Sequence, residues 1–182
     1  MESIIIIYII IGIVIFCLLS VAIIFNNLVR ARNKVKQSKS SIDVYLTQRF
    51  DLIPNLVETV KAYAVHETQT FTKLTEMRSQ YNNTKNLKLG ENLANEMNSI
   101  MAVAENYPEL KASEQFLSLE KTLIKIESQL QAARRIYNGD VTLYNTAIQS
   151  FPNSIIAGIF GFLPEELFTA EEYKKQNIKV EI

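Results

Sequence analysis

The sequence is poor in the residues from which metal and catalytic sites are usually built. Its 182 residues include one cysteine, one histidine and no tryptophan. A lone cysteine, Cys17, cannot form an intramolecular disulfide or a cysteine-built zinc site. His66-Glu67 resembles the start of the zinc-protease motif H-E-x-x-H, but position 70 is Thr70, so the second histidine ligand is missing. We therefore expect no metal and no cofactor, and interpret His66 as an exposed helical residue.

Other catalytic patterns are also missing. No G-x-S-x-G surrounds a serine, neither G-x-G-x-x-G nor G-x-x-x-x-G-K-[ST] offers a cradle for phosphates, and no Glu-x-x-His occurs. The sequence thus predicts a protein that is not an enzyme and has no catalytic residues. Solvated helical faces explain the glutamates of the helical segments better, namely Glu58, Glu67, Glu76, Glu120 and Glu127.

Glycine and proline are scarce, with 5 and 4 residues, and this argues against an all-β protein full of turns. No strand pattern of any length appears before the last residues, NIKVEI, which alternate apolar and polar side chains. The fold class predicted from the sequence is therefore all-α.

One long hydrophobic run is present. Residues 4–25, IIIIYIIIGIVIFCLLSVAIIF, are 22 positions without a charge. As a helix they would measure about 33 Å, which is enough to cross a hydrocarbon core of about 30 Å. The run is too long, and the Met-Glu-Ser before it too acidic, for a cleaved signal peptide. We predict an uncleaved transmembrane helix that contains Cys17, and assign residues 1–25 to the N-terminal tail and this helix.

Positive charge gathers just after the run. Residues 30–39, RARNKVKQSK, carry five basic side chains and no acid. No lysine or arginine precedes the run. Because positive residues stay cytoplasmic, we expect the N-terminus outside and residues 26–182 in the cytoplasm, at the cell membrane. The lipid bilayer is then a partner, whereas the acidic remainder argues against nucleic acid. The side chains expected to contact the membrane surface are Arg30, Arg32, Lys34, Lys36 and Lys39.

The soluble part shows helical periodicity. Apolar residues recur every seven positions between 113 and 151, with a second row three positions later, and only Asp140 interrupts the stripe. Ser113 is the predicted start of this helix. Gly139 lies inside it, so we expect a packing reason or a slight bend there. The first row consists of Phe116, Leu123, Leu130, Tyr137, Tyr144 and Phe151, and the second of Leu119, Ile126, Ala133 and Ala147.

Two further stripes precede that helix. One runs from Leu28 to Ile53, so the membrane helix is expected to continue into the soluble domain, and another runs from Leu56 to Tyr81. Between them Pro54 either starts a new helix at about 52–54 or kinks one long helix, and Asp51 is a candidate cap.

A polar segment comes next. NNTKNLKLG (82–90) is interpreted as a connection, followed by a shorter helix at about 91–106. The whole pattern predicts an antiparallel helical bundle of about four long helices over residues 26–163, with 164–182 as a C-terminal tail.

The segment FPNSIIAGIFGFLP (151–164) has two interpretations. It is a loop or short helix that covers the end of the bundle, or it docks on the membrane surface or on a partner. In the second case it is an interaction surface made of Ile155, Ile156, Ile159, Phe160 and Phe162.

Two stretches resemble the LemA family. They are NNLVRARNKVKQSKSSIDVYLTQRFDLIPNLVETVKAYAVHE and YPELKASEQFLSLEKTLIKIESQLQAARRIYNGDVTLYNTAIQSFPNSIIAGIFGF, and the likeness covers roughly residues 26–163. One departure is Ser41, where the family commonly has a tryptophan. The resemblance implies a bacterial, membrane-anchored helical protein and supplies no catalytic residue, cofactor or activity.

Two functional hypotheses remain open from the sequence. The first is a single-pass membrane protein whose cytoplasmic bundle acts as a non-enzymatic adaptor or scaffold for protein partners that the sequence does not identify. The alternative is a structural protein of the envelope that shapes or clusters membrane by forming homo-oligomers. Cross-linking in native membranes separates the two, because only the second requires large homo-oligomers.

Overall fold

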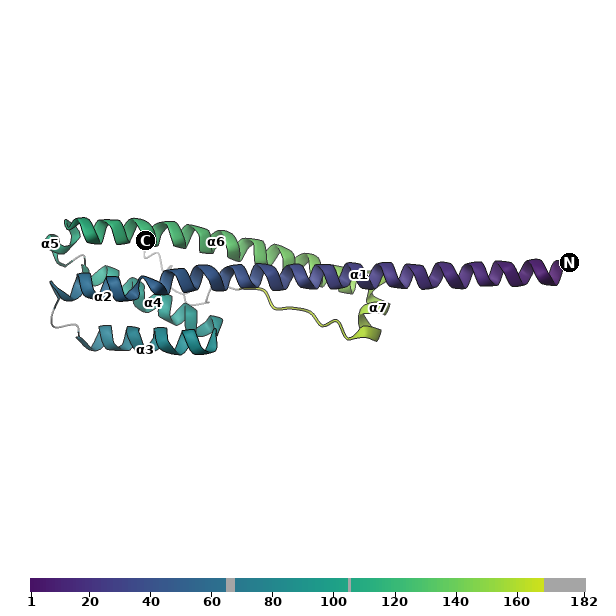
Figure 1. Ribbon diagram of the computed structural model, residues 1–182, viewed down its shortest axis with the longest axis horizontal. Coiled ribbons are helices and arrows are strands. Elements are labelled where there is room, and N and C mark those ends of the chain that lie inside the picture. Colours follow the sequence, from purple (N-terminus) through teal and green to yellow (C-terminus); the bar gives the residue numbers. More distant parts are fainter. Residues whose placement is uncertain (65–67, 105, 169–182) are drawn as a thin grey trace, which may run out of the picture. The chain divides into compact units, whose positions relative to one another are not determined.

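The computed structural model describes residues 1–64, 68–104 and 106–168, and every regular element within them is a helix (Figure 1). The all-α fold class is thereby confirmed. His66 and Glu67, as well as the C-terminal NIKVEI, lie outside the described residues. The helices are α1 (Glu2–Asp51), α2 (Ile53–Lys61), α3 (Thr68–Thr84), α4 (Leu87–Ala104), α5 (Pro108–Lys111), α6 (Glu114–Gln149) and α7 (Asn153–Phe160).

The chain divides into two compact units, and α1 and α6 each contribute to both. Unit 1 combines Met1–Ser38 with the chain from Arg134 onward, and unit 2 is Lys39–Ala133. The two units are described separately below.

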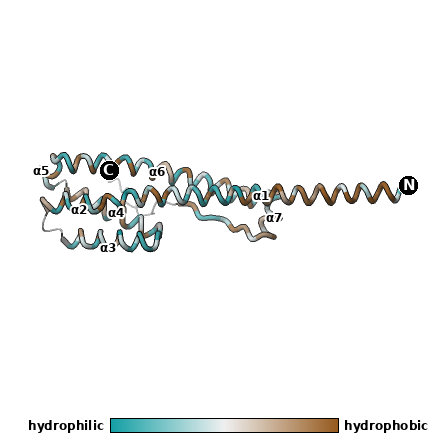
Figure 2. The backbone as a smooth tube through the Cα atoms, viewed as in Figure 1, coloured by the Kyte–Doolittle hydropathy of each residue, from teal (hydrophilic) through white to brown (hydrophobic). Residues whose placement is uncertain are grey.

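The N-terminal part of α1 is the one helix among the described residues that is long and apolar enough to cross a membrane. Its side chains are exposed throughout residues 4–19, and Figure 2 shows this part mostly in the hydrophobic colour. The helix continues without a break to Asp51, so the expectation that the apolar helix runs into the following domain is confirmed.

The corner at Pro54 begins a new helix. Residue Asp51 ends α1, Leu52 precedes α2 in a helical conformation, and Pro54 lies in the first turn of α2, where its missing N–H needs no intrahelical partner. The prediction that Asp51 caps this helix is wrong, because the capping position is Leu52 and no side chain bonds there. The Asp51 carboxylate instead accepts a hydrogen bond from Arg78 Nη2 at 3.0 Å.

The predicted connection at 82–90 is wrong for most of its length. Only Lys85 and Asn86 separate α3 from α4. Lys85 takes a left-handed conformation (φ 49°), and the Asn86 side chain accepts the backbone N–H of Lys88 at 2.9 Å, which caps α4. Because two residues suffice for this reversal, the polar sequence on either side remains helical.

The core of unit 2 closes around Tyr81. Its ring is fully buried and lies 4.8 Å from the ring of Phe50, and its hydroxyl donates to Asp43 at 2.7 Å. Burial, together with this hydrogen bond to a carboxylate, raises the pKa of Tyr81. Gly90 in α4 faces the same ring, since a Cβ added there would lie 2.9 Å from Tyr81 Cε2. This glycine therefore serves a close approach of helix and ring.

Helix α6 largely follows the predicted heptads. Ser113 caps it, with its hydroxyl accepting the N–H of Phe116 at 3.3 Å. Gly139 has no packing reason, since a Cβ there would meet nothing within 4 Å. Phe151, the last member of the first row, is 82% exposed because α6 ends at Gln149. The other members of that row are buried, namely Phe116, Leu123, Leu130, Tyr137 and Tyr144.

Candidate interaction surfaces

The segment 151–164 forms a short helix beside the end of the apolar part of α1. Helix α7 ends at Phe160 and is capped by Gly161, whose left-handed conformation (φ 69°) suits a residue without a Cβ. The ring of Phe25 lies 4.8 Å from that of Phe160 and 5.8 Å from that of Phe162, measured between ring centres. These contacts place α7 against the last turn of the 22-residue apolar run.

The five residues predicted to form one interaction surface separate into two groups. Ile156 and Phe162 are buried. Ile155, Ile159 and Phe160 are 55%, 71% and 53% exposed. The segment is thus a short helix, as in one interpretation, and still presents apolar side chains, as in the other.

The five basic residues predicted to contact the membrane lie along α1, and all are exposed. Lys34 Nζ lies 3.9 Å from the Asp140 carboxylate of α6. Along a helix, Arg30 is about 7.5 Å beyond Phe25, whereas Lys36 is about 16.5 Å beyond it. For a membrane boundary at Phe25, a surface potential that decays over a Debye length of about 8 Å would act more strongly on Arg30 and Arg32 than on Lys36, and the membrane contact itself stays a prediction.

Sequence reasoning missed a row of polar side chains on α6 that holds the extended segment 163–168. We call Tyr137, Asn138, Tyr144 and Asn145 the Tyr–Asn row. The amide of Asn145 donates to the Glu165 carbonyl (2.8 Å) and accepts the Glu165 N–H (2.9 Å). Asn138 makes the same pair of bonds with Phe168, at 2.8 and 2.7 Å.

The tyrosines of the row bind backbone as well. The Tyr144 hydroxyl donates to the Leu163 carbonyl and the Tyr137 hydroxyl to the Glu166 carbonyl, both at 2.9 Å. Burial raises the pKa of both tyrosines, so they stay protonated and able to donate at neutral pH. All six bonds therefore go to main-chain atoms of the segment.

The spacing of the row matches the repeat of an extended chain. Members of each kind are seven residues apart on α6, and the residues they bind are three apart in the segment. Seven helical residues rise about 10.5 Å, and three extended residues span about 10 Å. The two repeats coincide, so equivalent bonds form at successive positions. The signal in the sequence was the dipeptide Tyr-Asn, repeated at heptad spacing.

The side chains of the segment contribute less than its backbone. Leu163 is 74% exposed and Leu167 is 49% exposed. The main side-chain contact is that of Phe168, whose ring lies 4.6 Å from the Arg134 guanidinium. The six hydrogen bonds of the row therefore use the backbone of the segment and none of its side chains.

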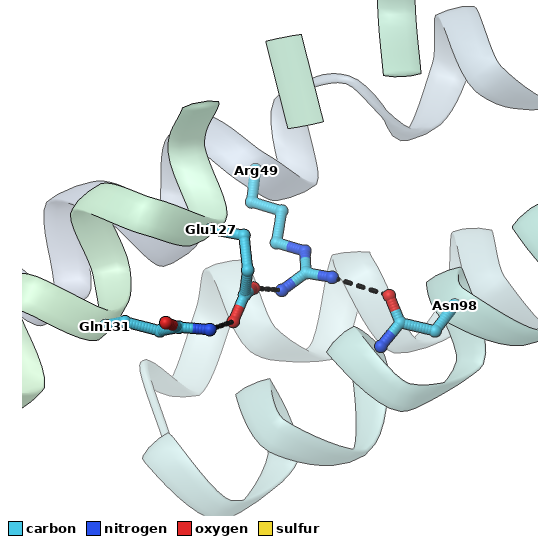
Figure 3. Close-up of polar contacts among 4 residues, drawn as sticks. All are labelled: Arg49, Asn98, Glu127 and Gln131. Carbon is cyan, nitrogen blue, oxygen red and sulfur yellow. Dashed lines mark hydrogen bonds and ion pairs between the residues drawn. The ribbon is translucent and has the colours of Figure 1, made fainter. Parts of the chain in front are cut away.

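Unit 2 contains a second polar arrangement, shown in Figure 3. The Arg49 guanidinium pairs with the Glu127 carboxylate of α6 and donates to Asn98 Oδ1 of α4 at 2.8 Å, while Gln131 also donates to Glu127. The Arg49 side chain is only 7% exposed. An open cavity of about 420 Å³ adjoins this cluster, and residues including Met97, Met101, Leu123 and Ile124 line it.

The cluster in Figure 3 is better suited to holding helices together than to acid–base catalysis. It contains one acid and one permanently charged base, and a guanidinium is a poor proton donor or acceptor near neutral pH. Within residues 1–64, 68–104 and 106–168, no group of three or more His, Cys, Asp or Glu side chains is arranged to hold a metal ion.

Comparison with known proteins gives a consistent result. A model of the LemA family matches residues 38–182. Protein LemA of Metamycoplasma hominis is 24% identical over 158 residues, which cover 84% of this chain and 72% of that protein. Magnetosome protein MamQ 2 of Paramagnetospirillum magneticum is 22% identical over 174 residues, covering 79% of this chain and 64% of that protein, so the chain spans less than two thirds of its length.

Proposed function

We propose that this chain, which belongs to the LemA family, is a membrane-anchored adaptor that catalyses no reaction and binds other proteins at the cell membrane. The proposal rests on one observation above all, the Tyr–Asn row. A helix surface that holds an extended backbone through six main-chain hydrogen bonds can accept an equivalent segment of another protein. In this structure residues 163–168 occupy that surface, so a partner segment has to displace them.

A backbone substitution in the segment tests this exchange. Phe168→Pro removes the N–H that Asn138 accepts and the ring that stacks on Arg134. Each such bond contributes about 1 kcal/mol, so the segment should loosen and a labelled peptide of residues 162–168 should bind the full-length protein roughly tenfold more tightly. Fluorescence polarisation measures the affinity, and amide hydrogen exchange at Glu165 reports the loosening directly.

Glu166→Pro is the matched control, because the bond described at Glu166 uses its carbonyl oxygen, which proline keeps. This variant should bind the peptide as the unchanged protein does. Adding Asn138→Leu to Phe168→Pro should abolish peptide binding. Equal affinities of the two proline variants, or no binding to either, would contradict the proposal that the row accepts segments of other chains.

The proposed orientation has the N-terminus outside and the helical domain in the cytoplasm. It is supported by the basic residues that follow the apolar run, and none precedes it. In a Cys17→Ala background, which has no other cysteine, single cysteines at the exposed positions Ser3 and Ser79 make the test clean. A membrane-impermeant maleimide should label Ser3→Cys in intact cells, and Ser79→Cys only after lysis. Labelling of Ser79→Cys in intact cells would contradict the proposed cytoplasmic location of the helical domain.

A further inference from the structure

Helix α7 carries an apolar face that the described residues leave uncovered. Ile155 and Ile159 are one helical turn apart, so they lie on the same side of α7, and both are more than half exposed. Phe160 is also 53% exposed, and Phe151 and Leu163, which flank the helix, are exposed too. Isolated exposed apolar residues are ordinary, whereas several within one short segment make that segment a candidate binding surface.

The position of α7 relative to the apolar run follows from the contacts of unit 1. Lys34 of α1 lies beside Asp140 of α6, and the nine residues from Lys34 back to Phe25 rise about 13.5 Å. The nine residues from Asp140 to Gln149 rise by the same amount, so α6 ends near the level of Phe25. The ring contacts of Phe25 with Phe160 and Phe162 agree with this level.

The charge distribution distinguishes this region from the rest of the chain. Residues 141–164 contain no Asp, Glu, Lys or Arg, and the flanking acids are Asp140 and Glu165. The uncharged stretch thus comprises the last turns of α6 and all of α7, which is the part nearest the apolar run. Such a stretch suits a surface at the edge of the hydrocarbon, because charged side chains are costly to place there.

We infer that the exposed face of α7 docks on the lipid bilayer, at the boundary between headgroups and acyl chains. Ile155, Ile159 and Phe160 then insert beside the last turn of the apolar run. This gives the protein a second membrane contact, separate from the spanning helix and from the Tyr–Asn row. The inference does not depend on the adaptor proposal.

Single tryptophans test the inference, since the chain contains none of its own. Ile159→Trp is introduced into the full-length protein, which is reconstituted into phosphatidylcholine vesicles with or without bromine on the acyl chains. Its emission maximum should lie at a shorter wavelength than that of a water-exposed tryptophan, and bromolipid should reduce its intensity by about half or more. Ile155→Trp provides a second reporter on the same face and should behave alike.

Two controls bracket the result. Leu19→Trp, within the apolar run, should be quenched. Ile136→Trp is exposed on α6, farther from the apolar run than Asp140, and should emit at longer wavelength and remain unquenched. Circular dichroism checks that each variant keeps its helicity. Tryptophans at 155 and 159 that resemble the one at 136 would overturn the inference. Blue emission without quenching would overturn it as well, because protein, such as a second copy, would then cover the face.

Discussion

Glu127→Ala is expected to lower the free energy of unfolding by about 3 kcal/mol, because it leaves the Arg49 guanidinium buried without its counter-charge. Arg49 is 7% exposed, and Glu127, at 32%, lies at the edge of the same contact. Asn98 remains as a neutral acceptor but cannot balance the charge. Thermal unfolding of the full-length protein in detergent, followed by circular dichroism at 222 nm, should show the loss as a lower Tm.

Glu96→Ala is the control for this variant. It removes the same side chain from the same unit, but its partner Lys73 is 61% exposed, so the change should be at most about 1 kcal/mol. The double variant Arg49→Met, Glu127→Leu should recover most of the loss, since it removes both charges together. If Glu127→Ala were as stable as the unchanged protein, the pair of Arg49 and Glu127 would contribute nothing to the stability of the fold.

The second large effect is expected at Gly90. Alanine is normally the better helix former by about 1 kcal/mol, but at this position its Cβ would press on the buried ring of Tyr81. That ring is held between Phe50 and the hydrogen bond to Asp43, so it has little room to move. Gly90→Ala should therefore destabilise the protein by about 1–3 kcal/mol, as overpacking of a core usually does.

Gly139→Ala makes the same substitution inside α6, where a Cβ has open space around it. There the helix propensity should dominate and stabilise the protein by up to about 1 kcal/mol. Thermal or urea unfolding of both variants gives the comparison. The prediction fails if the two glycines respond with the same sign, because the contact with Tyr81 would then have no energetic consequence.

The parts of the fold that the sequence predicted are those with long periodic patterns. The continuation of α1 to Asp51 and the heptads of α6 repeat over several turns, because one side of each helix is buried. The apolar run was predictable for another reason, since 22 uncharged residues are long enough to cross a membrane. The connection between α3 and α4 is shorter than the predicted 82–90 and consists of Lys85 and Asn86. The residues on either side are helical, but they contain few apolar residues that would show helical periodicity.

The Arg49 cluster and the Tyr–Asn row were harder to predict, because the residues that contact each other in them are far apart in the sequence. Arg49 and Glu127 are separated by 78 residues. One sign was present, since Arg49 occupies the heptad position that follows Leu28, Val35 and Ile42, where a charge is out of place unless it is paired. For the Tyr–Asn row the repeat on α6 was visible, but its ligand, residues 163–168, has no periodicity and was assigned mainly to the tail.

The matching repeats of the Tyr–Asn row also make it a filter for conformation. Three residues of a helical segment would rise only about 4.5 Å, less than half the distance between successive members of the row, and would already use their main-chain groups internally. A folded helix therefore cannot satisfy the row, and neither can a strand whose main-chain groups on that side are already paired within a sheet. Only chain that is extended and has free main-chain groups fits. Under the proposed adaptor function, the protein would therefore discriminate between unfolded and folded segments before it distinguishes one sequence from another.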